Sequence, residues 1–474
     1  MAAETLSDLF DAACVKYADR VALMTPDGQP VTFARSLEIV KSFSARLRDE
    51  GIVAGHTIAV SPENSAVYYL MAMAVQRIGA TFAVTHSADG AIRHGLNIDA
   101  AITQPDAPTV LTRNIPFDQN WFSHQGDSRI VSGGHFVFNS SGTTGVPKYY
   151  VVDQSLPVNW LHAWEQADSF QDMDVLSTLP IFSLFGIIIA ITGNLSGGAF
   201  YQSSASPEET LRNLSPQQDI CIKSVPSMIK DILDAVENGA PVPKNLKQVM
   251  MSGSAISKNF AQKIEDVLGC PALNGYGATE TGPTATPRPA KGPVDDGYIG
   301  HALPGVEIRL EGENGNEPAL GDEGEIAILV PEHSRVKETV IGTPAYDPKG
   351  WFRPGDVGYR LPDGDLVLTG RVSELINNHG VKVAPSLYEK LARRVLGVAD
   401  VAAFGVPNNE GSENVALAIV DKMTISDEDA VKLLRQGNTS AVDFQIFHVQ
   451  DIPKNLMGKT DRIKLRELFI SQSA

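Results

Sequence analysis

The sequence predicts an α/β fold, in which a large N-terminal domain precedes a small α+β domain. Three observations support this fold class. Short apolar runs alternate with segments of helical period over the first half of the chain, which is typical of largely parallel sheets covered by helices. Between about Gly292 and Leu368, strand-like runs separated by Gly-, Pro- and Asp-rich turns predict a β-rich subdomain. After Arg371 a compact pattern begins over about a hundred residues, a normal domain size.

The expected elements follow from the spacing of apolar residues. Helical faces are predicted at Leu6, Leu9, Phe10 and Ala13, and at Val67, Leu70, Met71, Ala74, Val75 and Ile78. Buried strands are predicted at Thr57–Val60, Thr81–Val84, Val175–Leu179 and Gln248–Met251. The β-rich subdomain should contain strands at Val306–Leu310, Gly324–Val330 and Leu366–Leu368. The C-terminal domain should contain helices at Leu387–Leu396, Asp427–Leu434 and about Asp461–Ile470, with strands at Val401–Val406 and Val415–Val420.

Composition and charge narrow the functional classes. The chain has 474 residues, 43% hydrophobic and 20% charged, which is typical of a globular protein with two or three domains. A formal net charge of -17 disfavours extended binding of nucleic acid. A small phosphate ligand stays compatible with this charge, because a few local cations and backbone N–H groups suffice to bind it.

The cysteines and the apolar segments bear on the compartment. Cys14, Cys221 and Cys270 lie far apart, which predicts neither a disulfide framework nor a zinc site and fits a reducing cytoplasm. The N-terminus lacks the apolar core of a signal peptide. Between Asp174 and Glu208 the chain carries no charge, but proline, serine and glycine residues interrupt the apolar run. We therefore expect a buried helix-and-strand unit here and no membrane span.

A glycine- and hydroxyl-rich segment, Asn139–Lys148, follows the apolar run His135–Phe138. Glycines allow the unusual dihedrals of a backbone wrapped around phosphate, N–H groups and hydroxyls donate to its oxygens, and the lysine adds charge. The segment is not a Walker A loop, because Pro147 precedes the lysine and Tyr149 follows it. Taken alone, it is equally compatible with a solvated turn between two strands.

A second segment, Asn274–Gly282, combines an aromatic ring, a hydroxyl and a carboxylate. Tyr276 can stack on a base, Thr279 can meet a phosphate, and Glu280 can hold Mg²⁺. Further along the chain, the carboxylate of Asp356 follows a glycine and is suited to ribose hydroxyls.

The remaining motifs are Gly370–Arg371 and the segment Pro453–Arg462, in which Lys459 follows a glycine. The order, spacing and identity of all these motifs resemble the adenylate-forming (ANL) superfamily of acyl- and aryl-CoA synthetases, peptide-synthetase adenylation domains and beetle luciferases. The resemblance covers essentially the whole chain and includes Gly300–Gly305 and Gly321–Glu325.

This resemblance implies the ANL fold, with an adenylation domain over residues 1–371 and a mobile lid domain over residues 372–474. ATP, the acid and Mg²⁺ would bind between them. Lys459, Glu280 and Thr279 are the implied catalytic residues: Lys459 bridges the acid and the α-phosphate, and Glu280 holds the metal. The other residues implied to bind ATP or AMP are Ser140, Ser141, Gly142, Thr143, Thr144, Gly145, Lys148, Ser252, Gly253, Ser254, Asn274, Tyr276, Gly277, Asp356 and Arg371.

The resemblance also implies sites for the acid and for coenzyme A. The acid pocket would include Trp160, Phe182, Ser183, Gly186 and Gly275, with the hinge of the lid at Ser373. After lid rotation a thiol tunnel would open beside Gly380, Val381 and Lys382.

Five positions depart from the family's common form: Tyr149, Ser183, Pro354, Ser373 and Asn377. None of them replaces the implied catalytic groups. Ser373 and Asn377 bear on lid rotation and thiol access, so they question the second half-reaction more than the first.

The acid and its acceptor are predicted from the implied pocket. Of the residues in and beside its segments, only Glu165 is charged. A second substrate carboxylate would need a buried cation, so we predict a monocarboxylic acid with an apolar or aromatic tail, not a diacid. The expected acceptor is the thiol of coenzyme A. Two alternatives stay open: an enzyme that loads a carrier protein, and a nucleotide-binding protein without catalytic activity.

Overall fold

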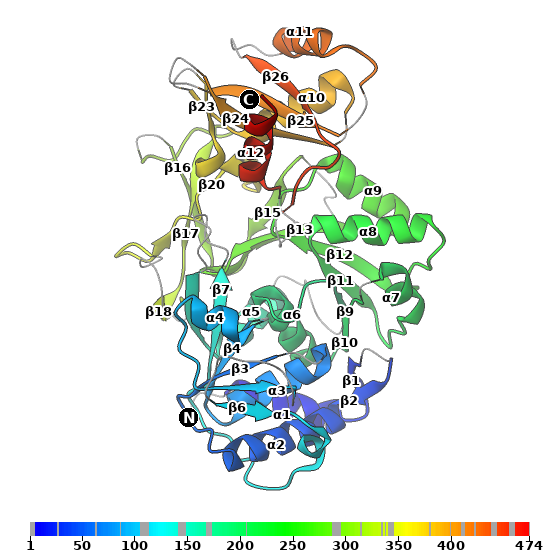
Figure 1. Cartoon of the computed structure of the whole chain (residues 1–474), viewed down its shortest axis with the longest axis vertical. Helices are drawn as coiled ribbons and strands as arrows, with labels where there is room; N and C mark the ends of the chain where they lie inside the picture. The colour runs from blue at the N-terminus through cyan, green and yellow to red at the C-terminus, as the bar shows by residue number, and fades with distance from the viewer. Residues whose placement is uncertain are drawn as a thin grey trace.

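The computed structural model describes residues 5–473 except 26–27, 62–63, 86, 105–112, 141–147, 167–172, 205, 287–294, 313–314, 333–334, 337, 340–345, 379–380, 399, 409–412, 421–422, 438–442 and 455–459. Figure 1 shows the described elements along one long axis, with the N-terminal helices at one end and the C-terminal elements at the other. The order of elements confirms the predicted α/β class.

A seven-stranded sheet lies in the N-terminal half, in the order β18-β8-β7-β4-β3-β5-β6. The strands from β7 to β6 are parallel, whereas β8 and β18 run antiparallel to their neighbours. Their bounds are β3 Thr57–Val60, β4 Thr81–Val84, β5 Ala100–Thr103, β6 Asn114–Pro116, β7 His135–Ser140, β8 Lys148–Asp153 and β18 Glu338–Thr339. The accompanying helices are α1 Leu6–Lys16, α2 Phe33–Asp49, α3 Ser65–Arg77 and α4 Ala88–Arg93.

Helix α3 confirms the predicted helical period but not the predicted single buried face. All its residues from Ala66 to Arg77 are buried. A helix surrounded by protein on all sides is expected to be apolar all round, and this stretch of the helix is so except at Gln76 and Arg77, which are buried at its C-terminal end. The helix belongs to the largest apolar core, which also includes Phe82 of β4, Phe136 of β7 and residues of the second sheet.

The second sheet follows the order β16-β17-β20-β21-β15-β14-β13-β12-β11-β9-β10-β1-β2. Its strands from β13 to β1 are parallel. Their bounds are β1 Val21–Met24, β9 Asp174–Ser177, β10 Phe200–Gln202, β11 Ile220–Ser224, β12 Leu246–Ser252 and β13 Ala272–Ala278, with β2 Pro30–Thr32 at the edge. Helices α5 Leu156–Gln166, α6 Leu184–Leu195, α7 Pro207–Asn213, α8 Pro226–Glu237 and α9 Lys258–Leu268 connect them.

The predicted β-rich part continues this sheet through antiparallel strands. These strands are β14 Gly282–Thr286, β15 Tyr298–Ala302, β16 Glu307–Glu311, β17 Gly324–Leu329, β20 Asp356–Arg360 and β21 Leu366–Arg371, with β19 Trp351–Phe352 paired to β17. The nucleotide motifs at Asn274 and Asp356 therefore lie on one continuous sheet, near the change from parallel to antiparallel pairing.

The C-terminal elements form an α+β unit with its own apolar core. Its three-stranded sheet has the order β24-β25-β26, with bounds Val401–Pro407, Glu413–Ile419 and Phe444–His448. Helices α10 Pro385–Leu396, α11 Asp427–Gly437 and α12 Arg462–Ser473 accompany it, and a short ribbon joins β22 Ile376–Asn378 to β23 Val381–Val383. Every helix and strand expected after Arg371 is present, displaced at its ends by three residues or fewer.

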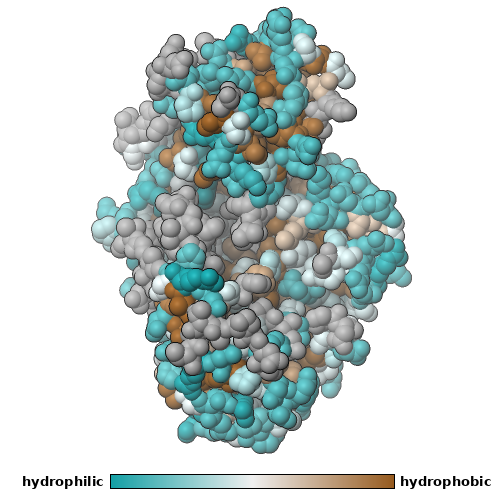
Figure 2. All heavy atoms as spheres, in the orientation of Figure 1, coloured by the Kyte–Doolittle hydropathy of each residue, from teal (hydrophilic) through white to brown (hydrophobic). Residues whose placement is uncertain are grey.

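The molecular surface agrees with a globular protein. Figure 2 shows mainly hydrophilic residues on the visible face, with hydrophobic residues most evident in the C-terminal part. Exposed large apolar side chains in that part include Leu387, Ile463 and Ile470. Within the described residues, no helix is both long enough and apolar enough to cross a membrane. The uncharged segment after Asp174 forms β9, α6 and β10, as expected.

Candidate active site

The predicted phosphate loop connects two paired strands. In the register of β7 and β8, the backbone of Ser140 pairs with that of Lys148. The two ends of the loop are therefore adjacent, as in a hairpin connection. Its interior, which includes the predicted contacts Ser141, Gly142, Thr143, Thr144 and Gly145, lies outside the described residues.

Thr279 and Glu280 occupy the turn between β13 and β14. The hydroxyl of Tyr150, on β8, donates to Oε1 of Glu280 at 2.8 Å. The hydroxyl of Tyr346 donates to the carbonyl oxygen of Glu280 at 2.6 Å. These contacts hold the predicted metal ligand beside the strand that follows the phosphate loop. Sequence reasoning missed Tyr150, although its place two residues after Lys148 was a usable signal.

The clearest convergence of predicted residues joins Tyr276, Asp356 and Arg371. The hydroxyl of Tyr276 donates to Oδ2 of Asp356 at 2.8 Å, and Nε of Arg371 donates to Oδ1 at 2.7 Å. Asp356 and Arg371 are register partners in adjacent strands. Burial, together with the neighbouring Asp356, raises the pKa of Tyr276 well above its ordinary value. The tyrosine is therefore a neutral donor, and both carboxylate oxygens of Asp356 are oriented by side chains in advance of any ligand.

Close packing explains two glycines of this segment. A Cβ on Gly277 would lie 2.2 Å from the carbonyl oxygen of Gly282. A Cβ on Gly282 would lie 2.1 Å from the indole nitrogen of Trp160, and this glycine has a φ of +68°. Trp160 thus packs directly against the turn that presents Glu280. Its ring also lies 6.0 Å, centroid to centroid, from that of Phe185 on α6.

A small cavity, partly open to solvent, lies beside Gly275–Gly277. Its walls come from β11, β12, β13, β14 and α6, at the carboxyl ends of the parallel strands, where open α/β sheets bind ligands. The described lining residues are Leu179, Phe185, Ile189, Lys223, Ser224, Met250, Ser252, Gly275, Tyr276, Gly277, Pro283, Ala285 and Thr286.

The predicted acid-pocket residues have different places in the structure: one lines the cavity and others lie at the start of helix α6. Gly275 lines the cavity, and a Cβ there would make only ordinary contacts, the nearest with the carbonyl oxygen of Met251 at 3.6 Å. Ser183 caps α6: its hydroxyl accepts from the N–H of Gly186 at 3.1 Å. Gly186 has no room for a side chain, since a Cβ would lie 2.0 Å from the carbonyl oxygen of Pro180. Phe182, Ser183 and Gly186 are not among the described lining residues of this cavity; Ser183 and Gly186 shape the start of α6, whose Phe185 lines it.

Lys223 is the lining residue that sequence reasoning missed. It is the fourth of the five residues of β11, near the carboxyl end of the strand, where it is buried and its ammonium donates to Sδ of Met250 at 2.9 Å. Burial lowers its pKa to about 8, partly offset by Cys221 on the same strand. A lysine inside the apolar run Ile220–Lys223 was the available signal. The sequence predicted a monocarboxylic acid because the expected pocket segments contained no cation. Those segments did not include β11, so the presence of Lys223 in the cavity wall removes this reason.

Other predicted nucleotide contacts lie at the ends of β12 and in β13. Ser252 ends β12, and Gly253 follows with a φ of +88°, so Ser254 turns away from the strand direction. Asn274 is buried in β13, and its Oδ1 accepts no hydrogen bond among the described residues. A buried acceptor without a donor is costly, and a ligand that donates a hydrogen bond would satisfy it.

Lys459 lies outside the described residues, but the chain on both sides of its segment is fixed. Lys454 and Thr460 form an isolated β-bridge, and the N–H of Asp461 donates to the carbonyl oxygen of Pro453 at 2.8 Å. The loop that carries Lys459 is therefore closed at its base.

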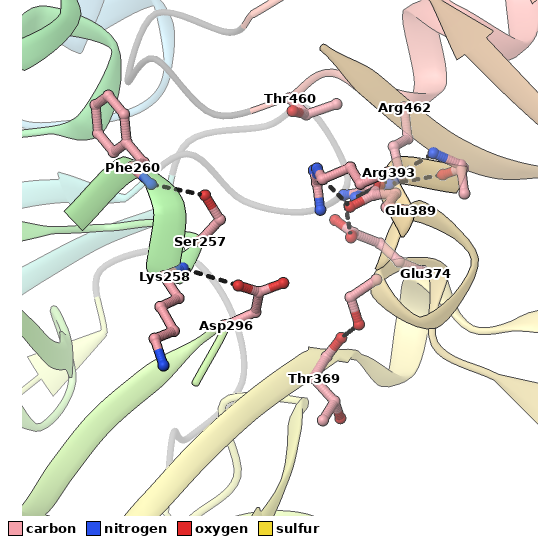
Figure 3. Close-up of polar contacts among 12 residues, drawn as sticks. Ser257, Lys258, Phe260, Asp296, Thr369, Glu374, Glu389, Arg393, Thr460 and Arg462 are labelled. Carbon is pink, nitrogen blue, oxygen red and sulfur yellow. Dashed lines mark hydrogen bonds and ion pairs between the residues drawn. The ribbon is translucent and has the colours of Figure 1, made fainter. Parts of the chain in front are cut away.

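Arg462, three residues after Lys459, anchors this loop to the C-terminal unit. Its guanidinium donates to Glu374 and to Glu389, each at 2.7 Å, and to the carbonyl oxygen of Ala403 at 3.0 Å. Figure 3 shows this cluster facing Ser257, Lys258 and Asp296 of the large part. Despite its burial, the pKa of Arg462 is raised by the two carboxylates.

The predicted hinge and tunnel residues are placed only in part. Ser373 is exposed in a short 3₁₀ turn, Val372–Glu374, directly after Arg371. Val381 and Lys382 belong to β23, whereas Gly380 lies outside the described residues. The N–H of Asn377 donates to Glu413 at 2.8 Å, which is a backbone contact and gives no reason for the missing lysine.

The described residues are compatible with a substrate-held metal. They contain no cluster of three or more His, Cys, Asp or Glu side chains that could form an all-protein metal site. Mg²⁺ commonly uses one or two carboxylates together with substrate phosphates. The fixed carboxylate of Glu280 fits that mode of binding.

Comparisons with known proteins agree with this geometry. Residues 130–334 match the family model described as AMP-binding enzyme. The chain is 25% identical to an oxalate–CoA ligase of Arabidopsis thaliana, with 100% of both chains covered. It is 26% identical to a 2-succinylbenzoate–CoA ligase of Listeria monocytogenes, over 96% of this chain and 97% of the relative.

Solved structures show the same fold. ATP-bound MatB from Rhodopseudomonas palustris superimposes with a TM-score of 0.83 at 21% identity, covering 99% of this chain and all of the other. The o-succinylbenzoate CoA synthetase of Bacillus subtilis, in complex with an acyl-adenylate, gives a TM-score of 0.80 at 18% identity, covering 97% of each chain. The chain therefore contains an AMP-binding enzyme segment over residues 130–334, is similar over its full length to proteins named as CoA ligases, and has the fold of these solved CoA synthetases.

Proposed function

We propose that this protein joins a small carboxylic acid to coenzyme A in two steps. First, a carboxylate oxygen of the acid bonds to the α-phosphorus of ATP while the bond to the bridging oxygen breaks, which gives acyl-AMP and pyrophosphate. Then the sulfur of coenzyme A bonds to the acyl carbon, AMP leaves, and the thiol proton is released. The observation that carries this proposal is the convergence of Tyr276, Asp356 and Arg371 beside the cavity at Gly275.

The ribose and the base would bind at that convergence. The two oxygens of Asp356 are held by Tyr276 and Arg371, and each oxygen keeps lone pairs for ribose hydroxyls. Because the carboxylate is already oriented, binding orders few side chains, which favours affinity. The ring of Tyr276 would stack on adenine, and the buried Oδ1 of Asn274 would accept a hydrogen bond from the nucleotide.

The phosphates and the acid carboxylate would lie between Glu280 and Lys459. Phosphoryl chemistry of this kind depends mainly on positioning and on neutralising charge. The loop Ser140–Lys148 binds the β- and γ-phosphates, Thr279 donates to the α-phosphate, and Lys459 bridges the acid and the α-phosphate. A Mg²⁺ ion on Glu280 supplies further charge neutralisation when bound.

We also propose the predicted division at residue 371, with residues 372–474 acting as a lid. The separate apolar core of β24–β26 and α10 supports this division, and so does the exposed turn at Ser373. Rotation about that turn would withdraw Lys459 after adenylation and bring Gly380, Val381 and Lys382 to the thiol path.

Coenzyme A is the proposed acceptor because full-length relatives are named as CoA ligases. They are named after different acids, so their names support the class of reaction and no particular acid. A carrier protein is the alternative acceptor. We further propose a cytoplasmic location, since all three cysteines are buried free thiols.

The deciding experiment is acid-dependent exchange of radiolabelled pyrophosphate into ATP, followed by identification of the product formed with coenzyme A. Exchange with an acid, and mass-spectrometric detection of its CoA thioester, are the expected results. Exchange without thioester, but with acylation of an added carrier protein, would exclude CoA as the acceptor. Nucleotide binding without exchange for any acid would exclude the enzyme altogether.

A further inference from the structure

Lys390 and Asp295 form an ion pair between the two parts of the chain that meet at residue 371. The ammonium of Lys390, on α10, donates to Oδ1 of Asp295 at 2.8 Å. Asp295 belongs to the large part and lies three residues before β15 begins. The two side chains are 50% and 34% exposed. The pair therefore lies at the surface of the boundary between the proposed adenylation domain and the proposed lid.

On the large part, Asp295 is held by two further donors. The hydroxyl of Tyr359 donates to Oδ2 at 2.7 Å, and the N–H of Asp296 donates to Oδ1 at 2.9 Å. Despite partial burial, the pKa of Asp295 lies below its ordinary value because Lys390 and Tyr359 donate to the carboxylate. Tyr359 belongs to β20, the strand that begins with Asp356. The lysine therefore meets a carboxylate that is oriented by the strand of the proposed ribose site.

On the lid side, α10 connects Lys390 to the loop that carries Lys459. Glu389, the preceding residue, accepts from the guanidinium of Arg462 at the base of this loop, at 2.7 Å. Successive residues of a helix point about 100° apart, so Glu389 is buried within the lid while Lys390 reaches Asp295. A displacement of α10 against the large part would therefore move the anchor of the catalytic loop as well.

The base of the Lys459 loop lies near helix α8 of the large part. Burial lowers the pKa of Lys454, which begins the β-bridge at this base, and the charges of Asp400 and Lys230 also act on it. Asp400 precedes β24 of the lid, Lys230 belongs to α8, and their charged groups lie 3.8 Å apart. The three side chains therefore lie near one another across the boundary.

This orientation brings the Lys459 loop toward the cavity. Helices α8 and α9 follow β11 and β12, at whose carboxyl ends the cavity lies. Figure 3 shows Thr460, the residue after Lys459, together with the Arg462 cluster, facing Ser257 at the start of α9. In the proposed function Lys459 acts at the cavity during adenylation, so the described orientation of the lid is the one for that half-reaction.

We propose that the Lys390–Asp295 pair positions the lid for adenylation and has to break before the lid rotates for thioester formation. Neither residue touches a substrate, and both act through the placement of Lys459. A partly exposed ion pair stabilises one arrangement modestly, so its loss should shift the equilibrium between the two lid orientations by about two- to fivefold. This inference rests on the proposed function and on the proposed division at residue 371, and it adds two positioning residues to that mechanism.

The test measures both half-reactions in Lys390→Met, with an acid that the wild type accepts. Adenylation is followed by pyrophosphate exchange, and thioester formation is followed from supplied acyl-adenylate and coenzyme A. The rate of thioester formation relative to that of adenylation should rise by about two- to fivefold over the wild type. This ratio, measured on one preparation, does not depend on the fraction of active enzyme, so a loss of folded protein leaves it unchanged.

The partner residue and a matched control complete the design. Asp295→Asn keeps an acceptor for Tyr359 but removes the charge, and it should raise the ratio by about the same factor. The double variant Lys390→Met/Asp295→Asn should show no further rise, because the effects of two partners in one contact are not additive. The control Lys432→Met removes an exposed lysine of α11, whose partner Glu428 at 3.5 Å belongs to the same helix, and should leave the ratio unchanged.

The outcomes distinguish this inference from the proposed function. An unchanged or lowered ratio in Lys390→Met would overturn the inference and leave acid ligation standing. The same rise in Lys432→Met, or effects of Lys390→Met and Asp295→Asn that multiply in the double variant, would also overturn it. A wild-type enzyme that shows no exchange with any acid would overturn the proposed function, and this inference with it.

Discussion

Arg371 and Asp356 are register partners on adjacent antiparallel strands, and Nε of the arginine donates to Oδ1 of the aspartate at 2.7 Å. The pair joins the proposed ribose carboxylate to the last residue before the exposed turn at Ser373. Its side chains are partly buried, so the contact is worth more than an exposed ion pair.

Replacing the carboxylate should therefore weaken ATP binding. Asp356→Ala leaves Arg371 and Tyr276 without their shared acceptor and removes the ribose contact. We expect kcat/KM for ATP in the exchange assay to fall by about 100-fold, from the loss of hydrogen bonds to a charged group of about 1.5–3 kcal/mol each. Glu317→Ala, which removes an exposed partner of Arg360 in the same sheet, serves as the control. Wild-type ATP kinetics in Asp356→Ala would remove this residue from the site.

Lys459→Ala should separate the two half-reactions. Loss of the bridging cation is expected to slow adenylation by about 100- to 1000-fold, as for loss of a group that stabilises transition-state charge. Thioester formation from supplied acyl-adenylate should continue at nearly the wild-type rate. Lys464→Ala, on exposed α12, is the matched control. Equal losses in both half-reactions would contradict lid rotation.

Two neighbouring glycines should respond differently to a methyl group. Gly277→Ala places Cβ 2.2 Å from a carbonyl oxygen, whereas the nearest atom to a Cβ at Gly275 is the carbonyl oxygen of Met251, at an ordinary contact distance of 3.6 Å. We expect Gly277→Ala to lower the free energy of unfolding by about 1–3 kcal/mol, as overpacking does, and Gly275→Ala by less than about 1 kcal/mol. Urea denaturation followed by circular dichroism measures both. Similar stability of the two variants would contradict the close approach of β13 and β14.

Arg462 should stabilise the C-terminal unit. Arg462→Met leaves Glu374 and Glu389 close together without their shared cation. We expect a loss of about 2–4 kcal/mol in the unfolding of this unit, near the lower range for breaking a buried pair because the side chains are partly exposed. Adding Glu389→Gln should restore part of that loss. Additive effects of the two substitutions, measured by urea denaturation, would argue against coupling.

The sequence was sufficient for the fold class because apolar periodicity records burial. It located the elements after Arg371 to within three residues at each end. It did not reveal that α3 is buried on every side, since the neighbours that cover it come from both sheets and are distant in sequence. Nor could it show that the antiparallel strands β14 to β21 extend the parallel sheet, because pairing depends on contacts between segments far apart.

The sequence identified some residues of the candidate site and missed others. Tyr276, Asp356 and Arg371 were named from separate motifs, and the structure brings them into contact. Lys223 was missed because a pocket wall is assembled from several strands, and a motif on one strand carries no information about the side chain beside it on the next. The assignment of Ser183 and Gly186 to the pocket stays a prediction; the structure adds that Ser183 caps α6 and that Gly186 packs against a carbonyl oxygen.

Lys223 and Tyr276 lie on strands separated by β12 alone, within one sheet. In the proposed function, β11 and β12 border the cavity that receives the acid, whereas β13, β20 and β21 carry the residues assigned to the nucleotide. Recognition of the two substrates is therefore modular. New acids can be accommodated, by divergence or by engineering, through side-chain replacements on β11, β12 and α6, while the ATP half of the sheet is retained unchanged.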